Sequence, residues 1–355
     1  MPEETIASLS VRRLSILDEA GTVDSSLMPA LTGEEMRRMY ELLVLSRIFD
    51  ARALALQREG RIGTYPSILG QEAAQVGSAF ALAKADWVFP SFREMGVHIT
   101  LGYPLHQLFQ YWAGDERGMR TPDDLNIFPI CVAVGTHIPH AVGAALAAKL
   151  RGDKAAVACY FGDGATSKGD FHEGFNMAGV FRVPAVFFCQ NNQWAISVPV
   201  ARQTAAPTLA QKAWSYGFEG VQVDGNDVFA VYRAAREALE RARNDGGPTF
   251  VECLTYRVGD HTTADDASRY RQAAEVEKWR GRDPILRLER HLAAEGLWNT
   301  VYQAEVRQRA EASVDEAVRL AESVTPPEPA EMFAAVGAVP SRRLRRQQED
   351  LRLGR

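Results

Sequence analysis

Apolar positions along the first part of the chain recur at the spacing of helices. The sequence TGEE at residues 32–35 has the pattern of a capping box, and apolar residues follow it at roughly helical spacing up to Gly60. This pattern predicts a helix between these two points, and a second helix is predicted over residues 71–82. Residues 1–31 show little periodicity and are predicted to form an N-terminal arm.

The most regular part of the chain lies between residues 155 and 255. Continuous apolar runs at 155–161 and 185–189 are typical of strands buried on both faces, and strand-like segments recur at 221–224 and 249–255. Helical patterns at 170–181 and 228–243 alternate with these strands. The alternation predicts an α/β fold with a doubly wound, mostly parallel sheet, flanking helices, and ligands at the carboxyl ends of the strands.

Turn residues and small residues mark the remaining organisation. Pro139 opens a small-residue helix over 141–150 that stops at Gly152, while residues 114–130 have the composition of a loop. Amphipathic helices are predicted beyond Asp283, before a proline-rich segment at 325–329. We therefore expect an arm at 1–31, one domain with C-terminal helices at 32–322, and a tail at 323–355.

Composition excludes several classes of protein. A net charge of −5 argues against nucleic acid as the main partner, and no apolar run approaches the roughly 18 residues of a membrane span. The basic cluster RRLRR at 342–346 is interspersed with acidic residues further on and predicts a solvated helix face. Four cysteines without a CxxC pair indicate reduced thiols, three of them buried in strands. The N-terminus lacks a signal peptide, so we expect a cytoplasmic protein.

The motif that carries chemistry joins the ends of two consecutive buried strands. The first strand delivers the sequence GDG at residues 162–164 to its carboxyl end, and the second ends in the pair NN at 191–192. Glycines let the backbone approach a phosphate at a helix N-terminus, and a carboxylate and an amide oxygen suit Mg²⁺. A turn aspartate with a capping asparagine pair is the structural alternative. No GxGxxG or GxxxxGK[ST] pattern is present, which disfavours nicotinamide and P-loop sites.

GDG followed by NN at this spacing is the thiamine-diphosphate motif. Its surroundings resemble the alpha subunit of the 2-oxoacid dehydrogenase component of the multienzyme complexes, which implies the thiamine-diphosphate-binding fold. The resemblance covers roughly residues 30–320, and the matching stretches are GTYPSILGQE at 63–72, FPSFREMG at 89–96, GDGATSKGDFHEG at 162–174, QNNQWAISVP at 190–199, VDGNDVFAVY at 223–232 and YRVGDHTTADDASRY at 256–270.

Carried over to this sequence, the resemblance implies a thiamine diphosphate site with Mg²⁺. The implied metal ligands are Asp163, Asn192 and the backbone carbonyl of Trp194. The implied contacts to the cofactor come from Phe92, Arg93, Val134, Asp163, Gly164, Ala165, Asn192, Arg257 and His261.

The family assigns separate tasks to these residues. Arg93 and Arg257 would bind the diphosphate, and Phe92 stands beside Arg93 where the family usually has tyrosine. Val134 matches the position whose backbone contacts the aminopyrimidine ring. His261 would contact the diphosphate and assist, as the catalytic residue of this chain, transfer of the acyl group.

Two further histidines, His137 and His140, are spaced i, i+3 at the predicted start of a helix. This spacing could suggest a metal pair. No third ligand is apparent in the sequence, so we favour structural or substrate-channel roles.

The resemblance also implies partners and a reaction. A beta subunit would supply the catalytic glutamate in an α₂β₂ heterotetramer, and the lipoyl group of a dihydrolipoyl transacylase would accept the acyl group. Stretches 164–174 and 204–212 look most like pyruvate dehydrogenases, so we expect oxidative decarboxylation of pyruvate, a small 2-oxoacid. Residues 223–232 and 346–349 look more like branched-chain 2-oxoacid dehydrogenases, which stay an alternative, as do acetoin dehydrogenases. Transketolase-like transferases and a non-catalytic subunit are the rivals from other classes.

Overall fold

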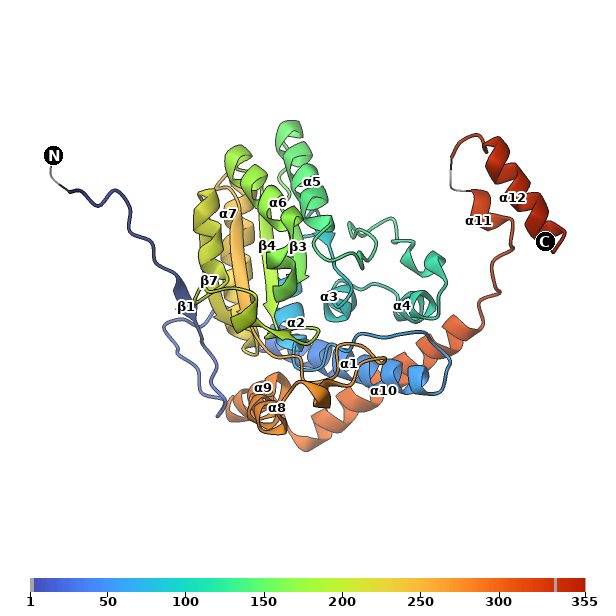
Figure 1. Ribbon diagram of the computed structural model, residues 1–355. Helices are drawn as coiled ribbons and strands as arrows, with labels where there is room; N and C mark the ends of the chain where they lie inside the picture. The colour runs from blue at the N-terminus through green and yellow to red at the C-terminus, as the bar shows by residue number, and fades with distance from the viewer. Residues whose placement is uncertain (1–2, 335–336, 355) are drawn as a thin grey trace.

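One parallel β-sheet organises the computed structural model, which describes residues 3–334 and 337–354 (Figure 1). The sheet has six strands in the order β1-β7-β8-β4-β3-β2, and every neighbouring pair is parallel. The strands are β1 (Arg12–Leu14), β2 (Trp87–Phe89), β3 (Val157–Gly162), β4 (Ala185–Asn191), β7 (Glu219–Asp224) and β8 (Thr249–Leu254). A separate antiparallel pair joins β5 (Trp194–Ala195) to β6 (Val198–Pro199).

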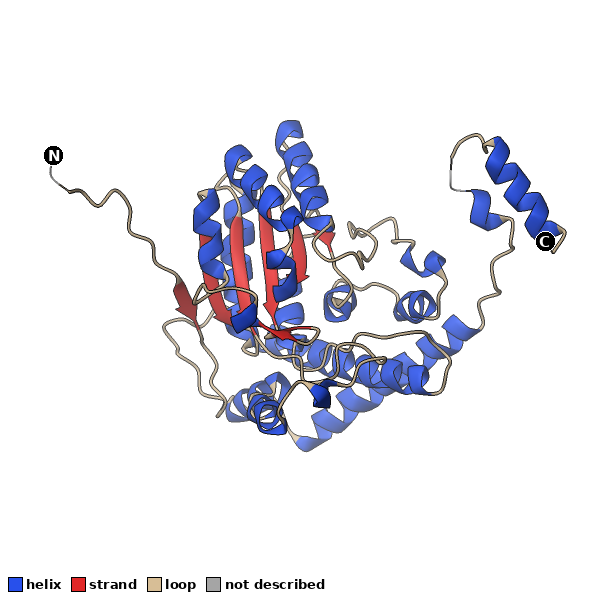
Figure 2. Ribbon diagram, in the orientation of Figure 1, coloured by secondary structure: helices blue, strands red, loops and turns tan. Residues whose placement is uncertain are grey.

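Helices cover both faces of this sheet (Figure 2), as the strand–helix alternation predicted. Alternate residues of β3 enter two separate cores: Ala158 and Tyr160 pack on the face of α1, α2 and α7, while Cys159 and Phe161 pack on the face of α5 and α6. Because the strand is buried on both sides, its sequence is a continuous apolar run. The predicted doubly wound α/β fold is confirmed.

The predicted helices are present, with ends that differ by a few residues. Thr32 caps the first helix: its side chain accepts from the Glu35 amide, and the Glu35 carboxylate accepts from the Thr32 amide at 2.7 Å. The small-residue helix begins at His137, two residues before Pro139, and ends at Gly152, whose φ is 73°. The helices are α1 (Gly33–Arg58), α2 (Glu72–Phe80), α3 (Met95–Thr100), α4 (Leu105–Trp112), α5 (His137–Arg151), α6 (Gly169–Phe181), α7 (Val228–Arg243), α8 (Ala273–Arg280), α9 (Pro284–Ala294), α10 (Thr300–Glu322), α11 (Glu331–Ala334) and α12 (Arg342–Arg352).

The segment expected to be an arm contributes the edge strand β1. Buried Asp227 fixes the chain just beyond this strand, because its carboxylate accepts from the Ile16 and Leu17 amides while it caps α7. At the other end, residues 325–329 form no helix or strand, and the basic cluster lies on exposed α12, which Figure 1 shows away from the sheet. The domain boundaries at 32 and 322 stay predictions.

Two expectations from composition can be compared with the described residues. All four cysteines are unpaired, and the three in strands are buried, namely Cys159, Cys189 and Cys253. In the described part of the chain no helix combines the length and the apolar character that crossing a membrane requires.

Replacing Thr32 by alanine should lower the free energy of unfolding by about 1 kcal/mol, because the first turn of α1 loses its side-chain acceptor. Urea unfolding followed by circular dichroism measures the change. Thr32→Ser, which keeps the hydroxyl, is the matched control and should unfold like the original chain. Equal loss in both variants would mean that the cap contributes nothing.

Candidate active site

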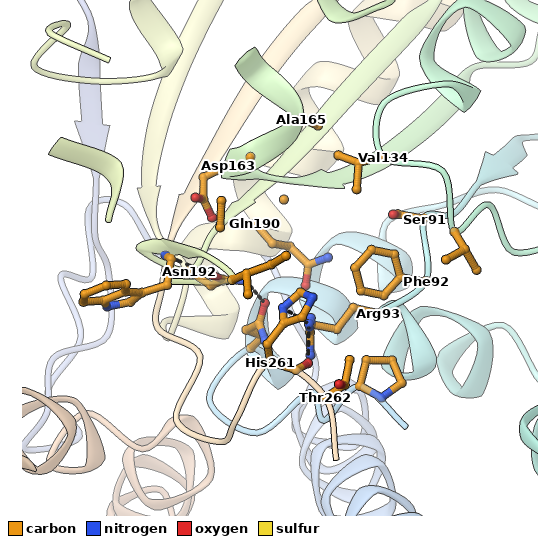
Figure 3. A pocket seen from close by; sticks show the side chains of 18 of the residues that line it. Ser91, Phe92, Arg93, Val134, Asp163, Ala165, Gln190, Asn192, His261 and Thr262 are labelled. Carbon is orange, nitrogen blue, oxygen red and sulfur yellow. Dashed lines mark hydrogen bonds between the residues drawn. The ribbon is translucent and has the colours of Figure 1, made fainter. Parts of the chain in front are cut away.

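A cavity of about 430 Å³ lies at the carboxyl ends of β3 and β4, which is where a doubly wound sheet is expected to bind a ligand. Figure 3 shows Asp163, Ala165 and Val134 on one side of it, with His261 and Thr262 on the opposite side. The predicted site residues that line it are Phe92, Arg93, Val134, Asp163, Gly164, Ala165, Asn192, Trp194 and His261. The fold therefore brings together predicted site residues that are up to 169 positions apart in the chain.

Local geometry explains the second glycine of the GDG sequence. β3 ends at Gly162, and a short 3₁₀ turn, η2 (Asp163–Ser167), begins at once and leads into α6. A Cβ on Gly164 would lie 2.8 Å from the Cβ of Ala195 in β5. Glycine is therefore required for β5 to approach the turn, and this approach brings Trp194 beside Asp163.

Three oxygen atoms converge at this point. The amide nitrogen of Asn192 donates to Gln71 Oε1 at 3.0 Å, which turns the amide oxygen toward the turn. That oxygen, Oδ1, then lies 3.3 Å from Asp163 Oδ1 and 3.0 Å from the carbonyl oxygen of Trp194. Three acceptors facing one another repel unless a cation or a donor lies among them.

The spacing fits a small divalent cation. Octahedral Mg²⁺ with ligands at about 2.1 Å places neighbouring ligand oxygens about 3.0 Å apart. The reversed Asn192 amide would instead donate to both oxygens and face the Gln71 amide with its own oxygen at 3.0 Å, so hydrogen bonding without a cation favours reversal. In the orientation that a cation would favour, the Trp194 amide also donates to Asn192 Oδ1, at 3.3 Å. Among the described residues, no three His, Cys, Asp or Glu side chains form a metal cluster, so a cation here would need amide and carbonyl oxygens.

Asp163 is a buried carboxylate with an incomplete set of partners. Burial raises its pKa to about 6, while a hydrogen bond from Gln203 Nε2 to Oδ2, at 2.6 Å, lowers it in part. A bound cation would favour the ionised form, because it would interact with the charge directly. Without a cation, the negative charge of Asp163 is therefore destabilised by burial.

Two arginines meet at His261. Arg93 Nη2 lies 3.2 Å from His261 Nδ1 and donates to the His261 carbonyl at 2.8 Å, and Arg257 Nη1 lies 3.0 Å from the same Nδ1. Both guanidinium groups are donors, so Nδ1 must accept and the ring proton belongs on Nε2. Burial and the charges of Arg93 and Arg257 lower the pKa of His261 to about 3. The histidine is therefore neutral.

Arg257 does not line the cavity. Its Nη2 donates to the Ile196 carbonyl and to the Tyr270 hydroxyl, each at 2.9 Å, so the guanidinium lies one hydrogen bond behind His261. Tyr270 in turn bonds Asp265, whose carboxylate accepts from the His261 amide at 2.8 Å. These bonds hold residues 261–270 against the cavity. Direct contact of Arg257 with a diphosphate stays a prediction.

Other polar residues at the cavity were not singled out from the sequence. Glu94 is buried, and burial raises its pKa to about 7 although it accepts from Gln190 Nε2 at 2.7 Å and from the Arg93 amide at 3.0 Å. Gln71 supports Asn192, and Gln203 supports Asp163. Gln71, Glu94 and Gln190 stand inside the stretches that carried the resemblance, so the signal was present in their neighbours.

The remaining predicted residues have simple placements. The Phe92 ring lies edge to face with His261, their centroids 6.1 Å apart, and Val134 is partly exposed at the cavity rim. His137 is buried with Nε2 bonded to the Tyr160 carbonyl at 2.7 Å, whereas His140 is exposed. His137 therefore has a structural bond, which agrees with the role favoured for it.

Comparison with known proteins gives consistent matches. The family model described as "Dehydrogenase E1 component" matches residues 40–330. The 3-methyl-2-oxobutanoate dehydrogenase subunit alpha of Mycobacterium tuberculosis H37Rv is 47% identical over 280 residues, 79% of this chain and 76% of the relative. The pyruvate dehydrogenase E1 component subunit alpha of Bacillus subtilis 168 is 43% identical over 310 residues, 87% of this chain and 84% of the relative. The corresponding subunit of Staphylococcus aureus N315 is 43% identical over 312 residues, with the same coverage of both chains.

His261 should stay neutral across the physiological pH range. In ¹⁵N-detected imidazole spectra, with His261→Gln for assignment, its Nδ1 should keep the shift of an unprotonated nitrogen from pH 8 to pH 5. The His261 imidazole has a pKa of 6.5 in the unfolded chain and of about 3 in the folded chain. Between these values the unfolded chain binds a proton on His261 and the folded chain does not. His261 should therefore lower the free energy of unfolding as the pH falls below about 6.5. A midpoint near 6.5 in the folded protein would contradict this assignment.

Proposed function

The chain belongs to the dehydrogenase E1 component family as an alpha subunit of a 2-oxoacid dehydrogenase, and we propose that it binds the diphosphate end of thiamine diphosphate through Mg²⁺ in the oxidative decarboxylation of pyruvate. The family implies the cofactor, and the observation that carries the metal assignment is the convergence of Asp163, Asn192 and Trp194 oxygens. When bound, thiamine diphosphate supplies a carbanion nucleophile and an electron sink for loss of CO₂.

The residues of this chain bind and orient that group. Asp163, Asn192 and the Trp194 carbonyl would hold Mg²⁺, with the remaining positions left for diphosphate oxygens and water. The first amides of the η2 turn, at Gly164 and Ala165, have no partners within the turn and suit an anion. Arg93, whose Nη1 is fixed by the Ser67 carbonyl at 2.7 Å, adds positive charge on the opposite wall.

His261 serves as a neutral donor in this proposal. Its Nδ1 is occupied by two guanidinium groups, so only Nε2–H is available to donate toward a phosphate or substrate oxygen. A neutral imidazole avoids adding a third positive charge beside Arg93 and Arg257. The contribution of His261 to acyl transfer rests on this orientation and on the family resemblance.

The proposal assigns the other half of the site to a beta subunit, a partner that membership in the family implies. Apolar side chains stand exposed at the cavity rim and beside it, with Val132 at 59% and Ile196 at 54% of full exposure. A partner surface would cover them and bring the glutamate needed at the aminopyrimidine ring. We propose an α₂β₂ assembly in the cytoplasm that passes its acyl group to the lipoyl group of a dihydrolipoyl transacylase.

The choice of pyruvate rests on stretches 164–174 and 204–212 and on the longer match to the pyruvate dehydrogenase relatives. A branched-chain 2-oxoacid is the second candidate, favoured by the 47% identity to the 3-methyl-2-oxobutanoate dehydrogenase subunit and by the apolar rim. The two substrates differ by a few carbon atoms, so a few side chains decide between them.

Gly164→Ala should weaken Mg²⁺-dependent binding of thiamine diphosphate about 10-fold, because the new methyl group pushes β5 and the Trp194 carbonyl away from Asp163. Calorimetry on the chain co-purified with its beta subunit measures the affinity. Gly164→Ala combined with Ala195→Gly removes the colliding methyl group and should recover most of it. Unchanged affinity in the single variant would place the metal elsewhere.

Substrate choice can be tested by CO₂ release from the assembled complex. We expect kcat/KM for pyruvate to exceed that for 3-methyl-2-oxobutanoate by about 10-fold or more, the discrimination that a few methyl groups allow. Equal or greater kcat/KM with the branched substrate would replace pyruvate by the second candidate. Activity with neither substrate would refute both assignments.

A further inference from the structure

The loop between α1 and α2, residues 63–70, supports the cavity from behind. Its Ser67 carbonyl accepts from Arg93 Nη1 at 2.7 Å. Its Tyr65 and the loop that carries His261 bond each other twice: the Tyr65 amide donates to Thr263 Oγ1 and the Thr263 amide donates to the Tyr65 carbonyl, each at 3.1 Å. The Val258 amide donates to the Leu69 carbonyl at 3.0 Å. The same loop therefore sets the positions of Arg93 and of residues 258–263.

One buried carboxylate on α1 fixes this loop. Asp50 Oδ1 accepts from the Tyr65 hydroxyl at 3.0 Å and from the Ile68 amide at 2.8 Å, and Oδ2 accepts from Ser67 Oγ at 2.6 Å. All three donors belong to the loop. The carboxylate is 2% exposed and does not line the cavity.

Burial of the Asp50 carboxylate is energetically unfavourable, so its presence on α1 requires a compensating role. Burial raises the pKa of Asp50 to about 6, the three donors lower it, and the groups that act on its charge are Glu72 on α2, Tyr65 in the loop and Arg93 beyond it. An apolar residue would fill the same volume without the desolvation cost. What the carboxylate adds is direction, because it binds a hydroxyl from each of two side chains and one backbone amide at fixed angles.

We propose that Asp50 is a positioning residue for the diphosphate site: through Tyr65, Ser67 and Ile68 it holds Arg93 and the His261 loop in the arrangement that receives the anion. The inference rests on the proposed function, since the anion is the cofactor diphosphate. Asp50 itself touches neither metal nor cofactor, and acts only through the loop.

Asp227 provides a matched control elsewhere in the molecule. It is also buried, burial raises its pKa to about 6 as well, and it accepts from the amides of Ile16, Leu17, Phe229 and Ala230. These bonds join the N-terminal segment to α7, and none of these residues lines the cavity. Asp227→Asn should destabilise the chain without disturbing the diphosphate site.

The experiment compares Asp50→Asn, Ser67→Ala and Asp227→Asn in the full chain co-purified with its beta subunit. Thiamine diphosphate affinity is measured by calorimetry at saturating Mg²⁺, and amide hydrogen exchange is followed without cofactor. We expect Asp50→Asn to weaken binding about 10- to 100-fold, the range for loss of a charged buried acceptor. Ser67→Ala keeps the carbonyl that Arg93 uses and should weaken binding about 5-fold.

Hydrogen exchange gives the readout that a general loss of stability would not produce. Asp50→Asn should speed exchange about 10-fold at the Ile68 and Thr263 amides while the α7 amides stay protected. Asp227→Asn should speed exchange near Ile16 and at the start of α7 and leave cofactor affinity unchanged.

Original affinity and protection in Asp50→Asn would overturn the proposal, and so would equal losses in Asp227→Asn. If Asp50→Asn does not fold, Ser67→Ala decides by the same two measurements. Failure of the unaltered complex to bind thiamine diphosphate would refute the proposed function instead, and exchange at Thr263 would still show whether Asp50 holds the His261 loop.

Discussion

Convergence of oxygen atoms at the tips of β3 and β4 is the constraint around which the site is built. Asp163 Oδ1 and the Trp194 carbonyl oxygen lie 3.3 and 3.0 Å from Asn192 Oδ1, in a place where Asp163 is almost fully buried. Parallel strands make such crowding possible, because neighbouring strands end at the same edge and deliver polar side chains to one point. The close approach of β5 to Gly164 adds the third oxygen. In the proposed function a divalent cation would lie among these oxygens.

Two positively charged side chains lie close together at the opposite wall of the cavity. Arg93 is buried, and burial together with the nearby charge of Arg257 lowers its pKa to about 10. Both guanidinium groups donate to carbonyl oxygens and to the neutral ring of His261, while Arg257 Nε has no partner. The groups that bond the guanidinium nitrogens are neutral, although nearby carboxylates, Glu94 and Asp50 for Arg93 and Asp265 for Arg257, offset part of each positive charge. An anion in the cavity would add a charged partner in direct contact. A diphosphate bridged to Mg²⁺ would compensate both walls at once, which explains why oxygen ligands and arginines face each other across a cavity of this size.

Sequence periodicity predicted the helices and strands that are long enough to show a regular apolar pattern. It did not predict the short elements. The strands that deliver Asp163 and Asn192 are continuous apolar runs, and the capping box marked the start of α1. β1 and β2 have three residues each, too few to show a period, and β1 exists because it pairs with β7, more than 200 residues away. Asp50 and Gln203 likewise act through contacts that no local pattern encodes. Gln71, Glu94 and Gln190 lie next to the residues that carried the resemblance, and only the folded arrangement distinguishes them from their neighbours.

The arrangement also explains why substrate choice is hard to assign from this chain. The described residues bring oxygen atoms and arginines to one cavity, with Gln71 in its lining and Asp50 and Gln203 bonded behind it. The rim that a substrate side chain would meet is instead made of exposed valine and isoleucine, which impose size but no hydrogen-bond pattern. In the proposed assembly a partner surface would close that rim, and its shape would fix the volume left for the substrate. In the proposed function, polar contacts within this chain would therefore specify binding of the diphosphate, whereas an apolar boundary shared with the partner would specify the length of the 2-oxoacid.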